Sequence, residues 1–377
     1  MNHPISGYIL TPQGFLWGEL VLSDEGRIQS LTGDLVDESR VRDGAHTIVL
    51  PGFIDLHVHG GAGRDIMQGG DAMQVVSQLH AQHGTTALLA TTMTAPTHDL
   101  EMAFCAMRDV AAQPGSKGAR VLGVHLEGPY INHGKLGAQP DFARAVEVDE
   151  LLRLHALFPI RLITLAPEVA GNMDLIDGLC KAGFKVQLGH SLASYEEGVQ
   201  ALAQGASGFT HLFNAMTGLS HRAPGLAGAA LAHAQYAEII PDLIHVHPGA
   251  IRVALRAIPS LYCVTDSTAA AGMPDGDYRL GRHTVTKCAG GVRLADGTLA
   301  GSTLTMDQAL RNLVNEMGLS VSEASARVST HAANYLGLQD RGHLSIGSWG
   351  DMVLLNRDLI LTNVFVEGMS IDHPHAA

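Results

Sequence analysis

Cysteine, basic residues and long apolar runs are all scarce in this 377-residue chain. The four cysteines lie far apart with no Cys-x-x-Cys pair, which argues against a disulfide framework or a zinc knuckle and for reduced thiols in a cytosol. No apolar run approaches about 18 residues and no signal-peptide pattern opens the chain, so we expect a cytoplasmic protein without a membrane partner. The net charge of −13 argues against nucleic acid as a partner.

Histidine, in contrast, is abundant, with 21 copies. Hydrophobic residues make up 46% of the chain and charged residues 16%, a composition typical of a globular, enzyme-sized protein. The length suits two domains, or one large α/β domain with an accessory. Any anionic substrate must be held by a few local cations, because the chain as a whole is acidic.

The stretch LPGFIDLHVHGG, residues 50–61, is an apolar run that ends in His57 and His59 and then in two glycines. Side chains two apart on a strand share a face, so both imidazoles point the same way. Neutral imidazole is the commonest protein ligand for zinc and similar metals. Alone, the pair fits half a metal site as well as it fits two hydrogen-bonded residues at a strand tip.

Short apolar segments separated by turn residues fill residues 1–50 and return near the C-terminus as HLSIGSWGDMVLLN and ILTNVFVEG. Neither set alone is large enough to enclose a core. We therefore expect a small β-sandwich domain built from both chain termini, residues 1–50 plus 341–377.

Residues 51–340 alternate apolar, β-branched runs with Ala- and Leu-rich helical windows. After the opening run come TTALLATTM, RVLGVHLEG, RLITLAP, KVQLGH, SGFTHLF, EIIPDLIHVH and LYCVTDS. Continuous apolar strands separated by helices predict the α/β class, and eight of them predict a (β/α)8 barrel of the TIM type as the catalytic domain. A doubly wound sheet is the alternative, but no Gly-x-Gly-x-x-Gly follows a strand run.

Polar residues close several of the later runs, namely Glu127, His190, His211 and Asp266. Catalytic residues of such barrels come from the carboxyl ends of several strands, so these side chains and the histidine pair should converge on one mouth. Each alone has a structural explanation, such as an Asx turn for Asp266. Together they predict a metal site. His125 faces the same interior one layer deeper, as a core residue or a support for the ligands.

Longer motifs carry a family resemblance. FIDLHVHG, GVHLEGPY, LGHS, HLFNAMTGLSHRAPGLAG, VTDSTAAAGMPDG and DGTLAGSTLTMDQALRN resemble segments of N-acetylglucosamine-6-phosphate deacetylases, in the amidohydrolase superfamily, nearly from end to end. The resemblance implies a metal-dependent hydrolase that converts N-acetylglucosamine 6-phosphate to glucosamine 6-phosphate and acetate. It also implies a barrel with a small β-sandwich, in agreement with the strand runs.

The resemblance further implies site residues. The metal ligands would be His57, His59, Glu127, His190 and His211. The substrate-binding positions would be Ala138, Gln139, Asn214, Ala215, Arg222, His245, Leu299, Ala300, Gly301 and Ser302. Asp266 would be the catalytic acid and base. One or two divalent ions are expected, bridged by Glu127 where two are bound, with zinc favoured by the imidazole-rich ligands and iron as the alternative.

One position departs from the family pattern. Gln139 stands where the family usually has a histidine that helps to polarise the acetyl carbonyl. A glutamine amide can donate a hydrogen bond but cannot carry a charge. Two interpretations follow: Gln139 is a weaker electrophilic helper, or the pocket is reshaped for another sugar or acyl group.

Other functions stay open beside the favoured one. N-acetylgalactosamine 6-phosphate is an alternative substrate, and an amidohydrolase acting on a cyclic amide or nucleobase is a further one. A non-catalytic scaffold would be expected to have a broken ligand set, yet all six metal and acid–base positions are filled. The resemblance also predicts a homodimer, with Arg222 and His245 serving the neighbouring chain's site.

Overall fold

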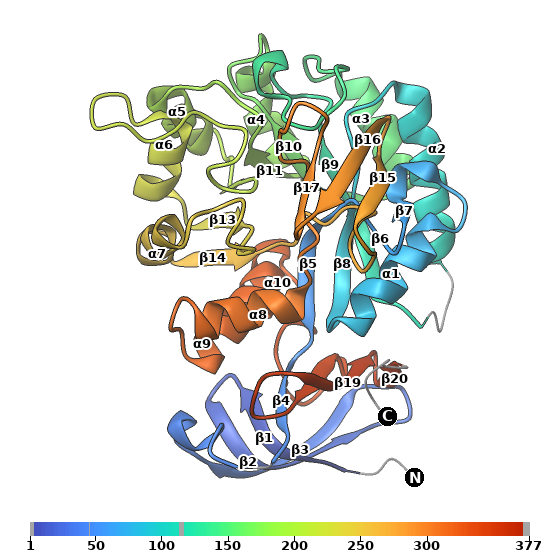
Figure 1. Ribbon diagram of the computed structural model, residues 1–377, viewed down its shortest axis with the longest axis vertical. Coiled ribbons are helices and arrows are strands. Elements are labelled where there is room, and N and C mark those ends of the chain that lie inside the picture. The colour runs from blue at the N-terminus through green and yellow to red at the C-terminus, as the bar shows by residue number, and fades with distance from the viewer. Residues whose placement is uncertain (1–3, 45, 113–116, 372–377) are drawn as a thin grey trace.

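The computed structural model describes residues 4–44, 46–112 and 117–371. It has two parts: a helix-covered barrel, and a curled sheet formed by segments from both ends of the chain at one end of the molecule (Figure 1). β4 (Ile48–Pro51) belongs to the curled sheet, and β5 (Phe53–Val58) begins the barrel. Only Gly52 separates the two strands, so the first barrel strand begins directly beside the terminal sheet.

The barrel contains all eight predicted strands. They are β5, β8 (Thr85–Thr91), β9 (Arg120–Glu127), β10 (Ile160–Leu165), β11 (Lys185–Leu188), β12 (Gly208–Phe209), β13 (Tyr236–Ile239) and β14 (Ser260–Cys263). Six form one parallel sheet in the order β12-β11-β10-β9-β8-β5, and β13 pairs with β14. Every residue of β8 is buried, as a strand covered on both faces requires.

Hydrogen bonds just beyond the strand ends close the ring. Leu212 N donates to Glu238 O at 2.9 Å, joining the segment after β12 to β13. Asp266 N donates to His57 O at 2.9 Å, joining the segment after β14 to β5. Asp55, which is fully buried, adds a side-chain link by accepting the Thr265 hydroxyl at 2.6 Å. The (β/α)8 fold is therefore confirmed.

Helices surround the barrel. They are α1 (Ala72–Gln82), α2 (Thr97–Ala111), α3 (Val148–Leu157), α4 (Asn172–Lys181), α5 (Tyr195–Ala203), α6 (Gly225–His233), α7 (Pro248–Ala257), α8 (Met306–Asn315), α9 (Val321–Ser325) and α10 (His331–Leu336). In α8, Met306, Ala309, Leu310 and Leu313 are buried at the spacing of one helix face. None of the helices in the described ranges has the length and apolar character needed to cross a membrane.

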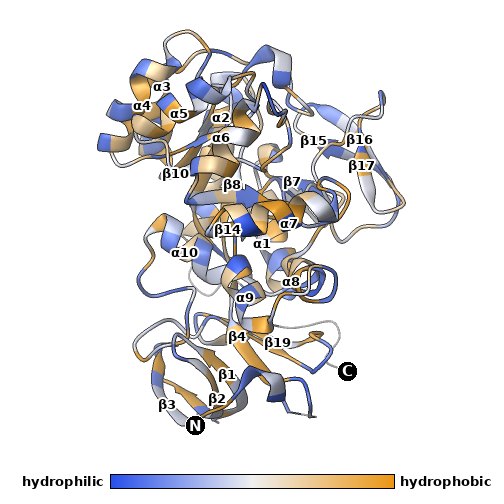
Figure 2. Cartoon of the chain, turned by 90° about the vertical axis from the view of Figure 1, so that its left-hand side faces the viewer, coloured by the Kyte–Doolittle hydropathy of each residue, from blue (hydrophilic) through white to orange (hydrophobic). Residues whose placement is uncertain are grey.

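The seven-stranded terminal sheet curls over its own core. Its order is β20-β19-β18-β4-β1-β2-β3, with β1 (Ile5–Thr11), β2 (Gly14–Leu22), β3 (Ile28–Leu35), β18 (Met352–Leu355), β19 (Leu361–Val366) and β20 (Met369–Ile371). Arg27, just before β3, pairs with Trp349, just before β18, so the two halves meet. Apolar residues run along β1 and β4 (Figure 2). The predicted small sandwich is one sheet folded on itself.

Two features differ from the sequence-based expectation. The run EIIPDLIHVH was expected as a strand, but the strand β13 ends at Ile239 and the rest is loop, because Pro241 cannot donate to a ladder. A three-stranded insert, β15 (Gly276–Leu280), β16 (His283–Cys288) and β17 (Gly291–Arg293), follows β14 and was not predicted. It packs beside the barrel (Figure 1), burying Leu280 and Val285 with Met93.

Candidate active site

Apart from His57, the predicted metal and acid–base residues line a cavity of about 340 Å³ at the carboxyl ends of the barrel strands. Seven of the predicted substrate-binding residues line it: Ala138, Gln139, Asn214, Ala215, His245, Leu299 and Gly301. Leu280 of the unpredicted insert lines it too, so the insert forms part of the wall. The volume lies within the range of small-molecule sites.

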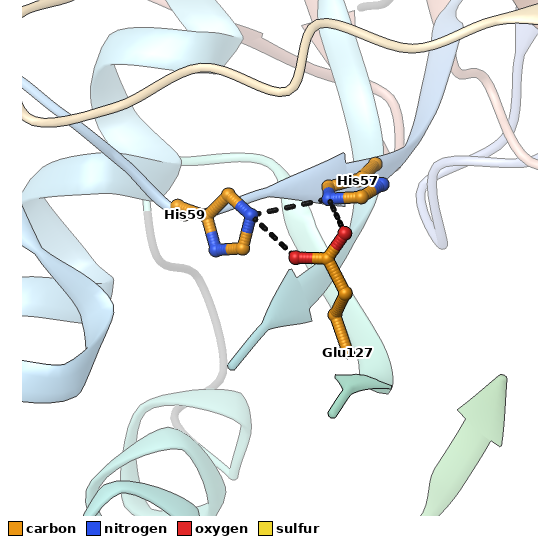
Figure 3. A group of neighbouring side chains, drawn as sticks. All are labelled: His57, His59 and Glu127. Carbon is orange, nitrogen blue, oxygen red and sulfur yellow. Dashed lines mark hydrogen bonds and ion pairs between the residues drawn. The ribbon is translucent and has the colours of Figure 1, made fainter. Parts of the chain in front are cut away.

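The first cluster of possible ligands consists of His57, His59 and Glu127 (Figure 3). Both histidines project from the end of β5, and their Nε2 atoms lie 3.1 Å apart. Glu127 approaches from β9, with Oε1 at 3.4 Å from His57 Nε2 and Oε2 at 3.2 Å from His59 Nε2. The alternation of side chains along a strand thus places both rings on one face, as predicted.

The second cluster shares Glu127 and adds His190 and His211. Oε1 of Glu127 lies 3.1 Å from His190 Nε2 and 3.0 Å from His211 Nε2, and the two Nε2 atoms are 3.1 Å apart. Both carboxylate oxygens of Glu127 are therefore engaged: Oε2 faces His59, and Oε1 faces His190, His211 and, at 3.4 Å, His57. This position between the two pairs is the one expected of a bridging ligand.

The hydrogen bonds of the other ring nitrogens determine which tautomers are present. His57 Nδ1 lies 3.0 Å from Glu238 Oε2, His59 Nδ1 lies 3.1 Å from Thr91 O, and His190 Nδ1 lies 2.7 Å from Lys135 O. These oxygens accept hydrogen bonds, so each Nδ1 carries the proton and donates. In the neutral ring, each Nε2 then presents a lone pair toward Glu127, which is the arrangement found around protein-bound metals.

The spacing also suits a metal. Two ligand atoms at about 2.0–2.1 Å from a tetrahedral zinc ion lie about 3.3 Å apart, close to the separations of 3.0 to 3.4 Å within each cluster. All five ligand candidates are buried. Imidazole lone pairs and a carboxylate that converge on one point away from water require a cation between them. The residues of this chain therefore fit one or two divalent ions.

Asp266 stands at the edge of both the ligand cluster and the cavity. Its Oδ1 lies 3.3 Å from His59 Nε2 and 3.5 Å from His57 Nε2, and the residue lines the cavity. Burial raises the pKa of this carboxyl, but the neighbouring His57 and His59 more than offset that effect, so its pKa lies below the ordinary value. Asp266 is thus held ionised beside the place where a substrate can enter.

The carboxylates and imidazoles of the cluster shift one another's pKa values strongly. Burial disfavours the charge on Glu127, yet His57 and His190 hold its pKa well below the usual range. Burial likewise lowers the pKa of His57, but Glu127 and Asp266 raise it well above the usual value. A group of opposite charges excluded from water is the cause in each case. Such mutual perturbation is typical of active sites.

Three site residues leave their strands with a left-handed backbone. The φ angles are +48° at His190, +27° at His211 and +49° at Asp266. Non-glycine residues seldom adopt this region, and such outliers gather at functional sites because the surrounding structure must hold them there. The turn aims each side chain into the barrel mouth rather than along the strand.

Glu238, on β13, was not singled out from the sequence. It is fully buried and accepts from His57 Nδ1 at 3.0 Å and from the backbone N–H of His211 at 3.1 Å. It therefore contacts one ligand residue of each pair. A signal was present in the sequence: a glutamate inside the apolar run AEIIP is seldom buried unless it is paired.

His125 lies behind the ligands, as expected. It is buried, with Nδ1 3.0 Å from Leu56 O and Nε2 2.7 Å from the Thr164 hydroxyl. Burial lowers its pKa to about 4, so the ring is neutral at neutral pH. Its ring packs edge-on against His57 at a centroid distance of 4.6 Å. Both nitrogens are engaged by oxygens outside the cavity, so His125 supports the site from below.

Gln139 has a defined orientation at the cavity wall. Its Oε1 accepts from Thr94 N at 2.7 Å, and its Nε2 donates to Glu127 Oε2 at 2.5 Å. The backbone donor at Thr94 identifies the oxygen end, so the amide nitrogen must point to Glu127. Gln139 contacts the proposed bridging carboxylate directly, and one amide hydrogen remains for a ligand in the cavity.

Three predicted substrate-binding residues do not line the cavity. Ala300 and Ser302 point away from it: Ala300 packs against the insert, and Ser302 donates to Thr265 O at 2.5 Å. Gly301, between these two residues, does line the cavity. Its φ is +61°, and a Cβ there would come within 2.8 Å of Asp266 O. Arg222 lines a separate hollow with Tyr195.

Comparison with known proteins agrees with this geometry. Residues 48–371 match the model of the family described as "Amidohydrolase family", which covers most of the chain. The chain belongs to the amidohydrolase family. Within it, this amidohydrolase is 39% identical to the N-acetylglucosamine-6-phosphate deacetylase of Vibrio furnissii, over 85% of this chain and 82% of that protein. The resemblance inferred from the motifs is therefore confirmed.

Two further relatives bear on specificity. The amidohydrolase is 40% identical to the N-acetylgalactosamine-6-phosphate deacetylase of Escherichia coli O157:H7, over 85% of this chain and 87% of that protein. Among solved structures, it resembles a mutant N-acetyl-D-glucosamine-6-phosphate deacetylase from Mycobacterium smegmatis in complex with N-acetyl-D-glucosamine-6-phosphate. That likeness has a TM-score of 0.88 at 32% identity and covers 97% of this chain and 98% of that one.

Proposed function

We propose that this protein is a metal-dependent deacetylase that hydrolyses N-acetylglucosamine 6-phosphate to glucosamine 6-phosphate and acetate. The observation that carries the proposal is the convergence of two histidine pairs on Glu127 with Asp266 beside them at a cavity. The relatives named above act on this class of substrate by their names. An amide, a metal-activated water and a carboxylate base form a consistent reaction.

The ligand set assigned to the metal is His57, His59, Glu127, His190 and His211. A divalent ion bound there supplies polarisation of the acetyl carbonyl and a water of lowered pKa. Zinc suits the imidazole-rich set and iron is the alternative. The Nδ1 hydrogen bonds to Glu238, Thr91 and Lys135 hold three rings with Nε2 inward, so the ligands are oriented before any ion arrives.

Asp266 carries the proton in the proposed reaction. Its carboxylate takes a proton from the attacking water and then delivers it to the departing amine nitrogen, so that acetate and a free amino sugar leave. Its position at the cavity edge, 3.3 Å from His59 Nε2, suits this transfer. The remaining amide hydrogen of Gln139 is placed to donate to the acetyl oxygen, while its other contacts hold Glu127.

N-acetylgalactosamine 6-phosphate is the second candidate substrate, because the Escherichia coli relative of that name is as similar as the Vibrio one. The two sugars differ at one hydroxyl. The test is to compare kcat/KM for the two 6-phosphates on enzyme loaded with zinc or iron, measuring acetate release. Preference for the galactosamine epimer would replace the proposed substrate but keep the reaction, whereas activity on neither would overturn both.

We further propose a cytoplasmic homodimer in which Arg222 serves the neighbouring chain's site. Arg222 lies outside its own cavity, and its hollow is lined by Leu192, an apolar side chain that is 47% exposed. His245 lines the cavity of its own chain, so the expectation of sharing is kept for Arg222 alone. Mixing an Arg222→Ala chain with an Asp266→Asn chain should restore activity; no rescue despite subunit exchange would exclude sharing.

We also propose that the chain has two domains. Residues 1–50 and 341–377 together form the small β domain, and residues 51–340 form the catalytic barrel. The terminal sheet then acts as a platform under the barrel, with none of its described residues in the cavity.

A further inference from the structure

The insert β15–β17 supplies one side chain to the catalytic cavity. Among the described residues of the insert, Leu280 alone lines the cavity, and it is 1% exposed. It lies at the end of β15, next to Gly281 and Arg282, which form the two-residue turn to β16. Gly281 has φ +53°, a left-handed conformation that such hairpin turns require and that glycine adopts readily. The turn therefore determines where Leu280 meets the cavity.

Leu280 forms an apolar wall with Met93. Both side chains are buried, belong to one hydrophobic cluster and line the cavity. Thr94, the residue after Met93, donates its N–H to Gln139, and Gln139 in turn donates to Glu127. The wall therefore adjoins the ligand cluster, where the carbonyl of an amide substrate must lie to be hydrolysed. In an N-acetyl amino sugar phosphate, the methyl group on that carbonyl is the one carbon that bears no oxygen or nitrogen, so an apolar wall suits it.

The turn is held on the barrel by Asp65, a buried residue of the short hairpin that follows His59. One carboxylate oxygen, Oδ2, accepts from Gly281 N at 2.5 Å, and the other accepts from Met67 N at 2.7 Å. Hydrogen bonds to an ionised carboxylate are stronger than those between neutral groups. Asp65 thus connects the loop that follows a proposed metal ligand to the turn that carries Leu280.

Other polar contacts of the insert hold the turn less firmly. Arg282, in the same turn, pairs with Asp99 at 2.7 Å, but the two side chains are 58% and 36% exposed, and an ion pair in water contributes little. Lys287 donates to Met273 O at 2.5 Å, but it lies at the opposite end of the β15–β16 hairpin. The buried carboxylate of Asp65 is therefore the contact that sets the turn.

We propose that Leu280 limits the length of the acyl group that the enzyme removes, and that Asp65 is the positioning residue that holds Leu280 in place. The inference rests on the proposed function, because it names which acyl groups the proposed deacetylase accepts. An acyl chain longer than acetyl would extend from the carbonyl into the wall of Leu280 and Met93. One extra methylene in an apolar pocket changes kcat/KM by about 10- to 200-fold. Asp65 touches no reacting atom and acts only through the turn.

The test measures kcat/KM for the N-acetyl and N-butyryl forms of whichever amino sugar 6-phosphate the wild type prefers, and the quantity compared is the acetyl-to-butyryl ratio. Leu280→Ala should lower this ratio by about 10-fold or more, because it opens the wall. Asp65→Asn should lower it by about 3- to 10-fold, because its one amide oxygen can accept from Met67 N but not also from Gly281 N. Adding Asp65→Asn to Leu280→Ala should change the ratio no further, because the side chain that Asp65 positions is then absent.

Hydrogen exchange gives a second readout that does not depend on activity. In Asp65→Asn, the backbone amides of residues 276–293 should exchange faster than in the wild type, while the metal content should stay the same. Asp37→Asn is the matched control, because Asp37 also accepts from a backbone N–H at the start of a short helix, from Ser39 N at 2.9 Å, but lies outside the cavity. It should leave the ratio and the exchange unchanged.

Other outcomes would overturn the inference. If Leu280→Ala keeps the wild-type ratio, Leu280 does not limit the acyl group. If Asp65→Asn speeds exchange in the insert but keeps the ratio, Asp65 is a structural residue and its positioning role is excluded. The same holds if Asp65→Asn lowers kcat/KM equally for both acyl forms. If the wild type removes neither acyl group, the proposed function itself fails and this inference fails with it, whereas hydrolysis of the acetyl form with an unchanged ratio in both variants overturns the inference alone.

Discussion

The two histidine pairs that share Glu127 are positioned in different ways. His57 and His59 come from one strand, and His57 is closed off from the cavity behind His59 and backed by Glu238. His190 and His211 come from two strand ends, have left-handed backbones and line the cavity. The first pair is fixed by strand geometry, and the second by turns that only the surrounding structure can hold. The first pair therefore suits a supporting ion, and the second an ion in contact with substrate.

The change expected to have the largest effect removes what the pairs share. Glu127→Gln keeps the shape of the side chain but neutralises the ligand on which both clusters converge. Metal bound per chain should fall to near zero, and kcat/KM should fall by about 10³-fold or more, since a bound metal contributes several kcal/mol. Metal analysis and acetate release measure this. Glu25→Gln, at an exposed position in the turn between β2 and β3, is the control. A variant that binds metal normally would show that Glu127 bridges nothing.

Asp266→Asn tests the residue that stands beside both pairs without being assigned to either. Turnover should fall by roughly 10²- to 10⁴-fold, because an amide cannot take and return the proton. Metal content and KM should stay near the wild-type values, which distinguishes this variant from Glu127→Gln. Turnover close to that of the wild type would remove Asp266 from the role of acid and base.

His57→Asn and His190→Asn compare the pairs directly. Wild-type protein loaded to saturation should approach two ions per chain. His57→Asn should bind one ion and keep more activity than His190→Asn, because His190 lines the cavity whereas His57 does not. Metal analysis and kinetics on the same samples measure both effects. A stoichiometry that never exceeds one, unchanged by His57→Asn, would show that the first pair is no ligand set.

Of these variants, Glu238→Gln should have the smallest effect on metal binding and activity. It tests whether the first histidine pair depends on its buried support. The amide oxygen can still accept from His57 Nδ1, but the charge that strengthens this bond is lost, so affinity for the supporting ion should fall by about 10- to 100-fold. Competition with a chelating dye measures the affinity. Tyr262→Phe removes the weaker 3.4 Å contact to Glu238, together with the 2.5 Å hydrogen bond that Gln187 donates to the same hydroxyl, and serves as the control. Equal affinity in Glu238→Gln and wild type would leave Glu238 a structural residue only.

Features that depend on neighbours along the chain were determined by the sequence itself. The eight apolar runs mark the barrel strands because a strand buried on both faces needs apolar side chains throughout. His57 and His59 share a face because side chains alternate along a strand. Polar residues at the ends of such runs converge because parallel strands end at the same mouth, so the sequence alone identifies Glu127, His190, His211 and Asp266.

Contacts between distant segments were decided only by the tertiary structure. Glu238 supports ligands of both pairs through bonds that span the barrel, and no local pattern specifies such a partner. Ala300 and Ser302 turn away from the cavity because Ala300 packs against the insert β15–β17 and Ser302 donates to Thr265 O. Arg222 lies in a separate hollow, and Lys135 is in the cavity because its carbonyl binds His190, 55 residues further along the chain. Residue type and local period are encoded in sequence, whereas the pairing of distant polar groups follows from how the elements close into one barrel.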